Sequence, residues 1–171
     1  MKGSTHLWMG ATLALVAGKS IFEGADVTSL IAYGALGGII SDIDSPQSMI
    51  SEIMPFVDKA WAKVRKFLKK MPKKTLLADI GEAMEHRGIT HTIWFCMIPW
   101  FFWAVNPIAS FGLIAGILSH ILVDMLNKHE IKPFYPLWNW GICLKLIKVG
   151  DTKEIALVYL VVLAFLGQFW P

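Results

Sequence analysis

Five apolar runs of 14 to 18 residues alternate with polar segments along the chain. At about 1.5 Å of rise per residue, helices of this length extend roughly 21–27 Å, close to the thickness of a hydrocarbon core of about 30 Å. The pattern predicts an all-α fold, a polytopic membrane helix bundle of about five spans that forms one integral membrane domain over residues 1–171. The predicted spans are residues 7–22, 27–40, 89–105, 108–125 and 155–170.

Composition supports the membrane interpretation. Hydrophobic residues make up 55% of the chain and charged residues 17%, whereas soluble domains carry about 25% charged residues. The balance excludes a disordered chain and argues against a nucleic-acid-binding protein. A large soluble helical core is the alternative, but the run over 155–170 contains a single uncharged amide, Gln168. Helices that are apolar on all faces need lipid or a much larger protein around them.

Basic residues lie almost entirely on one side of the predicted bundle. With tight turns near Gly24 and Asn106, residues 1–6, 43–88 and 127–153 share one face and hold one, nine and five of the 16 Lys and Arg residues. Lys and Arg are retained on the cytoplasmic side during membrane insertion. We therefore expect the N-terminus and this face to be cytoplasmic and the C-terminus to lie outside.

The long cytoplasmic loop, residues 43–88, contains a basic amphipathic pattern over residues 56–74. Apolar side chains recur there every three or four positions, and Lys or Arg fills most of the others. This spacing predicts an amphipathic basic helix. Such a helix lies in the headgroup layer and attracts anionic lipids; the alternative is a solvated helix that covers the end of the bundle.

His and Asp side chains gather at the span ends that share the predicted cytoplasmic face. They are His6, Asp42, Asp44, His86, His91, His120 and Asp124. Taken singly, each has a structural explanation, such as an interhelical hydrogen bond for His120. Their convergence on one end favours a metal site, and His120 and Asp124, four residues apart, share the helix face needed to bind one cation.

The chemistry of this set restricts the metal. Imidazole and carboxylate ligands without thiolate favour Zn²⁺, with Mn²⁺ as the alternative. Seven candidates exceed the needs of one tetrahedral ion, so two ions, or one ion and an acid/base residue, fit the count. The two cysteines, Cys96 and Cys143, form neither a disulfide framework nor a metal knuckle.

A second group of candidates lies in the segment HRGITHT, residues 86–92. Gly88 allows a turn that folds His86 back beside His91. Arg87 carries a fixed fork of donors that suits phosphate oxygens. The alternative role for Arg87 is that of a basic anchor on the cytoplasmic side.

The motifs STH, SDIDSPQS, HRGITHT and SHILVDMLN, followed by a Pro-containing segment over 133–138, resemble the YdjM-type membrane-bound metal-dependent hydrolases of bacteria. The resemblance covers residues 4 to about 140 and implies an integral inner-membrane protein with a His/Asp metal site. It also implies a distant similarity to zinc-dependent phospholipases C, which use a helical His-x3-Asp pair. Ser41, Ser45 and Asn127 depart from the family's usual Pro, His and Thr.

Together these observations favour a metal-dependent phosphoesterase acting on a lipid or lipid-linked phosphate at the cytoplasmic leaflet. In this hypothesis His86 is a ligand or the proton donor to the leaving group, and Arg87 holds the phosphate. The alternative is a non-catalytic membrane protein whose structural metal joins the helix ends and whose basic loop recruits a partner or anionic lipid. Transport is less favoured, because ionisable residues cluster at one end. The expected metal ligands are His6, Asp42, Asp44, His91, His120 and Asp124.

Overall fold

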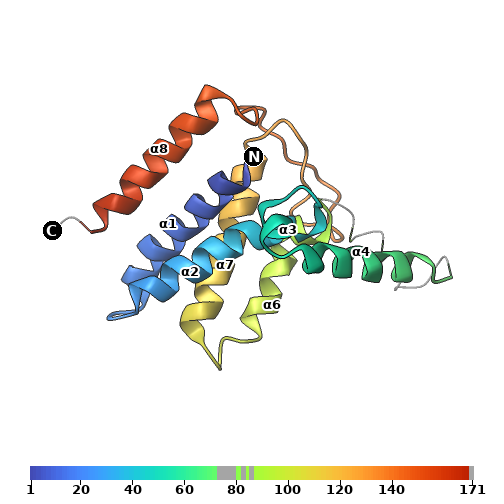
Figure 1. Cartoon of the computed structure of the whole chain (residues 1–171), viewed down its shortest axis with the longest axis horizontal. Coiled ribbons are helices and arrows are strands. Elements are labelled where there is room, and N and C mark those ends of the chain that lie inside the picture. Colours follow the sequence, from blue (N-terminus) through green and yellow to red (C-terminus); the bar gives the residue numbers. More distant parts are fainter. Residues whose placement is uncertain (73–79, 82–83, 85–86, 170–171) are drawn as a thin grey trace.

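The computed structural model describes residues 1–72, 80, 81, 84 and 87–169 (Figure 1). Apart from one isolated bridge between Ile131 and Ile142, the regular elements in these residues are helices. The predicted all-α class is confirmed. The elements are α1 (Gly3–Ile21), α2 (Val27–Ile40), η1 (Ser41–Asp44), α3 (Met49–Ile53), α4 (Pro55–Lys69), η2 (Ile89–His91), η3 (Ile93–Cys96), α6 (Met97–Trp100), α7 (Pro107–Met125) and α8 (Thr152–Gly167), where η marks a 3₁₀ helix.

Side-chain caps fix where the two most apolar helices begin. The Asp26 carboxylate accepts hydrogen bonds from the backbone N–H groups of Thr28 and Ser29 at the start of α2. Asn106 accepts from the N–H of Ala109 at the start of α7, where Pro107 occupies the first helical position. Caps satisfy backbone donors that have no partner within the helix. The apolar runs therefore become helices close to their predicted limits.

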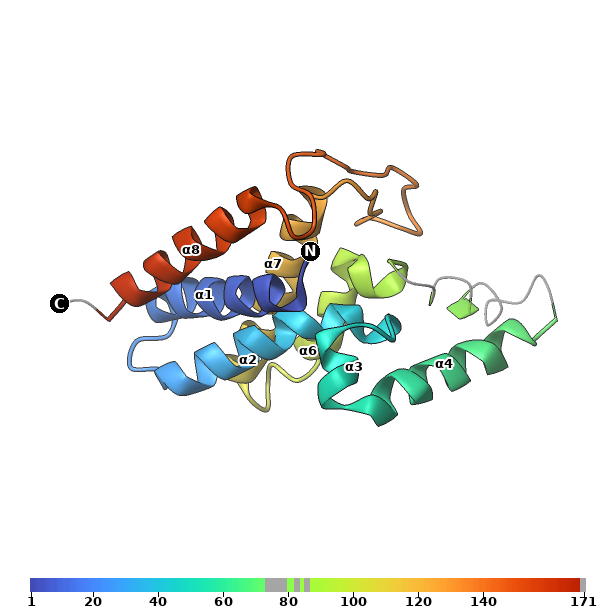
Figure 2. The same ribbon diagram turned by 45° about the horizontal axis from the view of Figure 1, so that its top comes forward.

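Helices α1, α2 and α7 form the core of the molecule and contact one another along their lengths (Figures 1 and 2). Glycines make this close approach feasible. A Cβ atom added to Gly34 of α2 would collide with the carbonyl oxygen of Gly10 on α1, and one added to Gly116 of α7 would collide with that of Gly34. Small residues permit such backbone contacts between membrane helices. The packing brings the N-terminal turns of α1 to the C-terminal ends of α2 and α7.

Helix α8 is attached to the start of α1 through Glu154. This side chain is 2% exposed. Its carboxylate accepts hydrogen bonds from the backbone N–H groups of Lys2 and Gly150, at 2.7 and 2.6 Å, and from the Thr5 hydroxyl at 2.8 Å. A buried carboxylate with three donors is well satisfied. Glu154 therefore connects two helices that are far apart in sequence.

Replacing Glu154 with Ala should lower the free energy of unfolding by about 2–4 kcal/mol, because three donors lose a charged acceptor. Burial raises the pKa of Glu154, but the bonds from Lys2, Gly150 and Thr5 outweigh it and hold that pKa below its usual value of 4.5. The stabilisation is therefore present above about pH 4.5 and is lost as the pH falls further. Thermal unfolding in detergent, with the exposed neighbour variant Lys153→Ala as control, measures the difference. Equal unfolding temperatures at pH 7 would contradict this role.

The apolar run over 89–105 differs from its prediction, because it does not form one continuous helix. The chain makes η2, η3 and the four-residue α6 instead, with Thr92 extended between the first two (φ −107°, ψ 155°). The N–H of Ile93 bonds the carbonyl oxygen of Pro133, outside the segment. Pro99 offers no backbone N–H and prevents a regular helix through this point. Tertiary contacts thus divide a run whose apolar pattern predicts a span.

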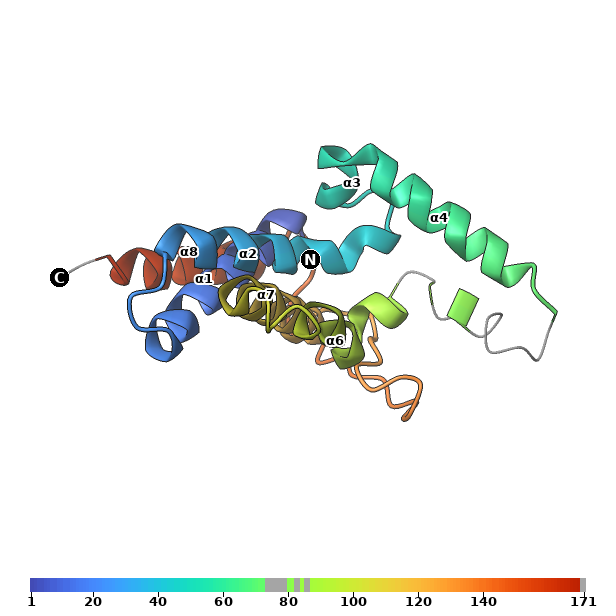
Figure 3. The same ribbon diagram turned by 90° about the horizontal axis from the view of Figure 1, so that it is seen from below.

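Two segments among the described residues are long and apolar enough to cross a membrane: residues 27–44, which comprise α2 and η1, and α7. The number of five spans stays a prediction. Helix α4 confirms the amphipathic helix expected from residue 56 onward, and Lys73 and Lys74 at its predicted end lie outside the described residues. In the three views α4 extends away from the α1, α2 and α7 core (Figures 1, 2 and 3).

Candidate metal centre

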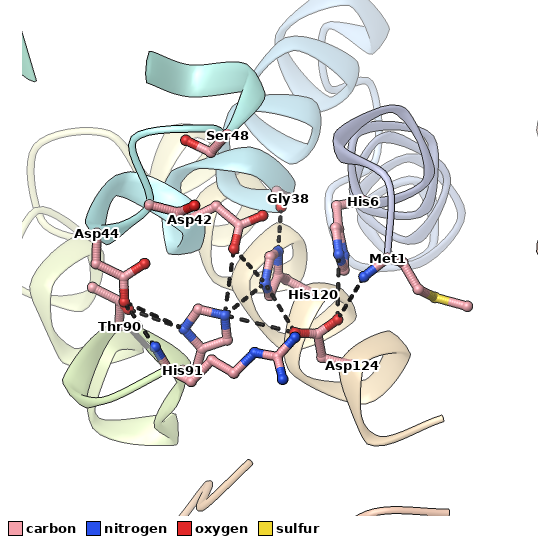
Figure 4. Close-up of polar contacts among 12 residues, drawn as sticks. Met1, His6, Gly38, Asp42, Asp44, Ser48, Thr90, His91, His120 and Asp124 are labelled. Atoms are coloured by element: carbon pink, nitrogen blue, oxygen red, sulfur yellow. Dashed lines mark hydrogen bonds and ion pairs between the residues drawn. The ribbon is translucent and has the colours of Figure 1, made fainter. Parts of the chain in front are cut away.

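A cluster of His and Asp side chains lies where the start of α1 meets the ends of α2 and α7 (Figure 4). Helix α1 contributes His6, η1 contributes Asp42, η2 contributes His91, and α7 contributes His120 and Asp124. The three histidines are at most 1% exposed and Asp124 is 3% exposed. Residues separated by more than a hundred positions therefore meet in one buried polar site.

Four side-chain atoms of this cluster face one another. The Nε2 atoms of His91 and His120 lie 3.2 Å apart. Asp42 Oδ1 lies 3.5 Å from His91 Nε2 and 3.7 Å from His120 Nε2. Asp124 Oδ2 lies 3.7 and 3.9 Å from the same two nitrogens. Ligands held about 2.0–2.2 Å from a tetrahedral Zn²⁺ lie about 3.3–3.6 Å from each other. The separations that involve the two nitrogens are thus close to those between ligands of one tetrahedral ion.

A backbone carbonyl fixes the protonation of His120. Its Nδ1 lies 2.7 Å from the carbonyl oxygen of Gly38 on α2. Because a carbonyl oxygen only accepts, Nδ1 carries the proton and donates it, and Nε2 keeps its lone pair. Gly38 also packs against the His6 backbone, since a Cβ atom there would collide with the His6 carbonyl oxygen. The α1–α2 contact therefore positions two candidate ligands.

The Thr90 hydroxyl determines which ring nitrogen of His91 carries the proton. Thr90 donates its hydroxyl hydrogen to Asp44 Oδ2 at 2.8 Å. Its oxygen is thus an acceptor toward His91 Nδ1, which lies 3.0 Å away. With the Nδ1 hydrogen donated to Thr90, the His91 Nε2 lone pair points at the four-atom group. Asp44 therefore orients the His91 ring through Thr90, on the Nδ1 side of the ring. Its Oδ2 lies 3.9 Å from His91 Nδ1.

The donor set fits a divalent cation. Both Nε2 atoms present lone pairs to each other at 3.2 Å, and carboxylate oxygens of Asp42 and Asp124 lie beside them. Four electron-rich atoms at this spacing repel one another unless a positive charge lies between them. Neutral imidazoles with carboxylates suit Zn²⁺ and Mn²⁺. The described residues thus provide a set of ligands that could hold a divalent metal ion.

Replacing Thr90 with Val should weaken Zn²⁺ binding about 10–100-fold, because the partner that orients a ligating His is lost. Competition with a chromophoric chelator in detergent measures the affinity. Thr12→Val is a matched control, since the buried Thr12 hydroxyl has no hydrogen-bond partner among the described residues. Unchanged affinity in Thr90→Val would mean that His91 is oriented without this hydroxyl.

His6 forms a second group with His120 and Asp124, and one ligand atom from each lies within 4.8 Å of the others. The His6 ring stacks on the His120 ring with centroids 3.8 Å apart. His6 Nε2 lies 3.4 Å from Asp124 Oδ1, the oxygen that faces away from His91. The Met1 amino group lies 3.2 Å from the same oxygen. Two buried His/Asp triads that could hold metal ions therefore share His120.

Arg87 lies at the edge of the cluster in a left-handed backbone conformation, with φ at +65°. Its N–H donates to Asp44 Oδ2 at 3.0 Å. Its buried Nε has no hydrogen-bond partner among the described residues, so a donor of the guanidinium fork is available to a ligand. His86, the other sequence candidate here, lies outside the described residues, and its role stays a prediction.

A cavity of about 310 Å³ adjoins the cluster. His6, Asp42, Asp124 and Arg87 all line it, together with polar side chains of the loop after η1 that include Ser45, Gln47 and Ser48. Such a volume is at the lower end of the range for small-molecule sites. Three of the candidate metal ligands and Arg87 therefore border one polar space.

The YdjM inner membrane protein family model matches residues 1–170 of the chain. The chain belongs to this family. It is 25% identical over 163 residues to inner membrane protein YdjM of Escherichia coli (strain K12), and the matched region covers 90% of this chain and 76% of that protein. It is 27% identical over 139 residues to uncharacterized protein YvsG of Bacillus subtilis (strain 168), and the matched region covers 80% of this chain and 74% of that protein. No solved structure matches. As a YdjM-family member, the protein is an inner membrane protein.

Two positioning groups were missed by sequence reasoning, the Gly38 carbonyl and the Thr90 hydroxyl. A backbone carbonyl leaves no signature in a sequence. The threonine does leave one, because Thr precedes His in both Thr5-His6 and Thr90-His91. In each pair the Thr hydroxyl donates to a buried carboxylate, that of Glu154 or Asp44.

Proposed function

We propose that this YdjM-family protein is a metal-dependent phosphoesterase acting on a lipid or lipid-linked phosphate at the cytoplasmic leaflet. The Asp124 carboxylate carries the proposal. One of its oxygens faces His91 and His120, and the other faces His6 at the edge of the polar cavity. A carboxylate with both oxygens engaged in this way suits a pair of ions bridged by one residue, the arrangement common in phosphoester cleavage.

The two proposed ion sites differ in how completely protein atoms fill them. The site between His91, His120, Asp42 and Asp124 Oδ2 has four protein ligands. The site at His6 and Asp124 Oδ1 has two, besides the His120 ring that both triads share, and an ion there would take the place that the Met1 amino group holds beside Oδ1. Its remaining coordination positions would be open to water and substrate oxygens toward the cavity. A purely structural metal needs only the first. A second, incompletely filled site would support catalysis over the non-catalytic alternative.

Divalent ions at these ligands would supply an ionised water near neutral pH and a Lewis acid for phosphoryl oxygens. The chain's own residues supply orientation and charge. Gly38 and Thr90 keep the two Nε2 lone pairs directed inward. Arg87 would contact phosphate oxygens as negative charge grows on them during displacement. His86 is proposed as proton donor to the leaving group or as a further ligand.

The orientation in the membrane remains part of the proposal. Fifteen of the 16 Lys and Arg residues lie in segments that the predicted topology places on the face of the cluster, and the retention of Lys and Arg inside the cell favours a cytoplasmic site. Candidate ligands at span ends lie at headgroup depth, where a lipid phosphate is found. A phosphorylated lipid is therefore the substrate class that the placement favours.

Turnover assays on the purified protein in detergent test the proposal. We expect Zn²⁺- or Mn²⁺-loaded protein to release product from a phospholipid, an isoprenoid phosphate or a generic phosphodiester at neutral pH. A chelator should abolish the activity, metal should restore it, and His120→Ala should lack it. Metal-loaded protein that cleaves none of these substrates would favour the structural-metal alternative.

A further inference from the structure

Helix α4 exposes an apolar surface that the described residues leave uncovered. Phe56, Ala60, Val64 and Phe67 follow one another at intervals of four, four and three residues and so share one helix face. We call these four residues the apolar stripe. Phe56, Val64 and Phe67 are 65%, 50% and 61% exposed. Large exposed apolar side chains in a row mark interaction sites.

The adjoining side of α4 is packed, which shows that the stripe is a separate surface. Trp61 donates its indole N–H to the carbonyl oxygen of Met84 at 3.2 Å. Val57 and Leu68 are half-buried on the same side, and α4 contacts α3 and η1. A helix that only covers the end of the bundle would bury its apolar face there. Here α4 extends away from the core (Figure 3), and no described residue covers the stripe.

Lysines border the apolar stripe. Lys59, Lys63 and Lys70 fall along one edge of it by helical spacing, and all three are exposed. Lysine side chains can bury their aliphatic stems beside an apolar surface while the ammonium group stays in the polar layer. An apolar face about one helix wide, edged by cations, is the pattern of helices that lie in an anionic membrane interface.

We propose that the apolar stripe of α4 inserts into the headgroup layer of an anionic bilayer, with Lys59, Lys63 and Lys70 against lipid phosphates. Charge complementarity selects this occupant, and the protein already resides in a membrane by its family. Because α4 contacts η1, which carries Asp42, insertion anchors the segment next to the metal cluster. The proposal stands independently of any catalytic activity.

Fluorescence from a single label tests the insertion. With Cys96 and Cys143 replaced by Ser, the full chain carries a nitrobenzoxadiazole label at Val64→Cys on the stripe or, as matched control, at the exposed Ala62→Cys on the opposite face of the helix. Each protein is reconstituted in phosphatidylcholine alone or mixed with phosphatidylglycerol. We expect nitroxides on the lipid chains to quench the Val64→Cys label in the anionic bilayer, and the Ala62→Cys label to stay accessible to aqueous quenchers. Changing Lys63 to Gln should lower insertion about fivefold, the effect of one cation near an anionic surface.

Three outcomes would overturn the proposal. A Val64→Cys label that stays open to aqueous quenchers in both bilayers would show that the stripe is solvated. Equal insertion in neutral and anionic bilayers would remove the role of the lysines. A label shielded from water but not quenched by lipid nitroxides would show that a protein surface covers the stripe. Monodisperse elution of each labelled protein excludes misfolding as the cause.

Discussion

Replacing Asp124 with Ala should deprive the purified protein of bound Zn²⁺. Four-ligand structural zinc sites bind with about 10–16 kcal/mol, so the loss of one ligand should cost about 3–4 kcal/mol, or roughly 10²–10³-fold in affinity. Asp124 faces His91 and His120 with one oxygen and His6 with the other, so both proposed ion sites should be affected. Elemental analysis of metal bound per protein measures the effect.

Two companion variants make this result specific. Asp124→Asn keeps the size of the side chain and removes its charge, so it should also lose metal. It provides the test if the Ala variant fails to fold. Glu23→Ala removes an exposed carboxylate from the turn between α1 and α2 and should retain metal. Wild-type metal content in both Asp124 variants would exclude Asp124 as a ligand.

Replacing Arg87 should separate turnover from metal binding. Loss of a donor that stabilises charge in a transition state costs about 10²–10³-fold in rate. Metal content should stay near the wild-type level, because Arg87 contacts Asp44 through its backbone N–H, which the substitution preserves. Arg87→Gly is the preferred variant, since glycine adopts a φ of +65° without strain.

The conservative variant Arg87→Lys sharpens the same prediction. It keeps the positive charge and loses the planar fork, so it should recover part of the turnover that Arg87→Gly loses. Turnover equal to wild type in the Gly variant would contradict a role in phosphate contact. Loss of both metal and turnover would instead show that the Arg87 side chain helps to position Asp44 and His91 for metal binding.

The candidate site was predictable because helix alternation is visible in the sequence. His120 and Asp124 are one turn apart on a strongly apolar helix, and tight connections at Gly24 and Asn106 bring the other span ends to the same side. The structure places His6, Asp42 and His91 close to that pair, and their role as metal ligands stays a prediction. Convergence of this kind depends only on the order and direction of helices.

Local geometry could not be predicted in the same way. Asp44 was expected among the ligands, and its carboxylate instead contacts the Thr90 hydroxyl on the far side of the His91 ring. Whether an acidic residue touches a metal or orients its ligand depends on differences of a few ångströms. The prediction of a single helix over 89–105 was wrong for a related reason. The Ile93 N–H donates to the carbonyl oxygen of the distant Pro133, and the spacing of apolar residues does not indicate such a contact.

X-ray absorption spectroscopy on the wild-type protein loaded with Zn²⁺ tests the metal centre most directly. We expect about four nitrogen and oxygen neighbours at about 2.0–2.2 Å, with the outer-shell scattering of imidazole rings from His91 and His120. A sulfur neighbour at about 2.3 Å would assign the metal to Cys96 or Cys143 instead. A shell without imidazole scattering would contradict the centre described here.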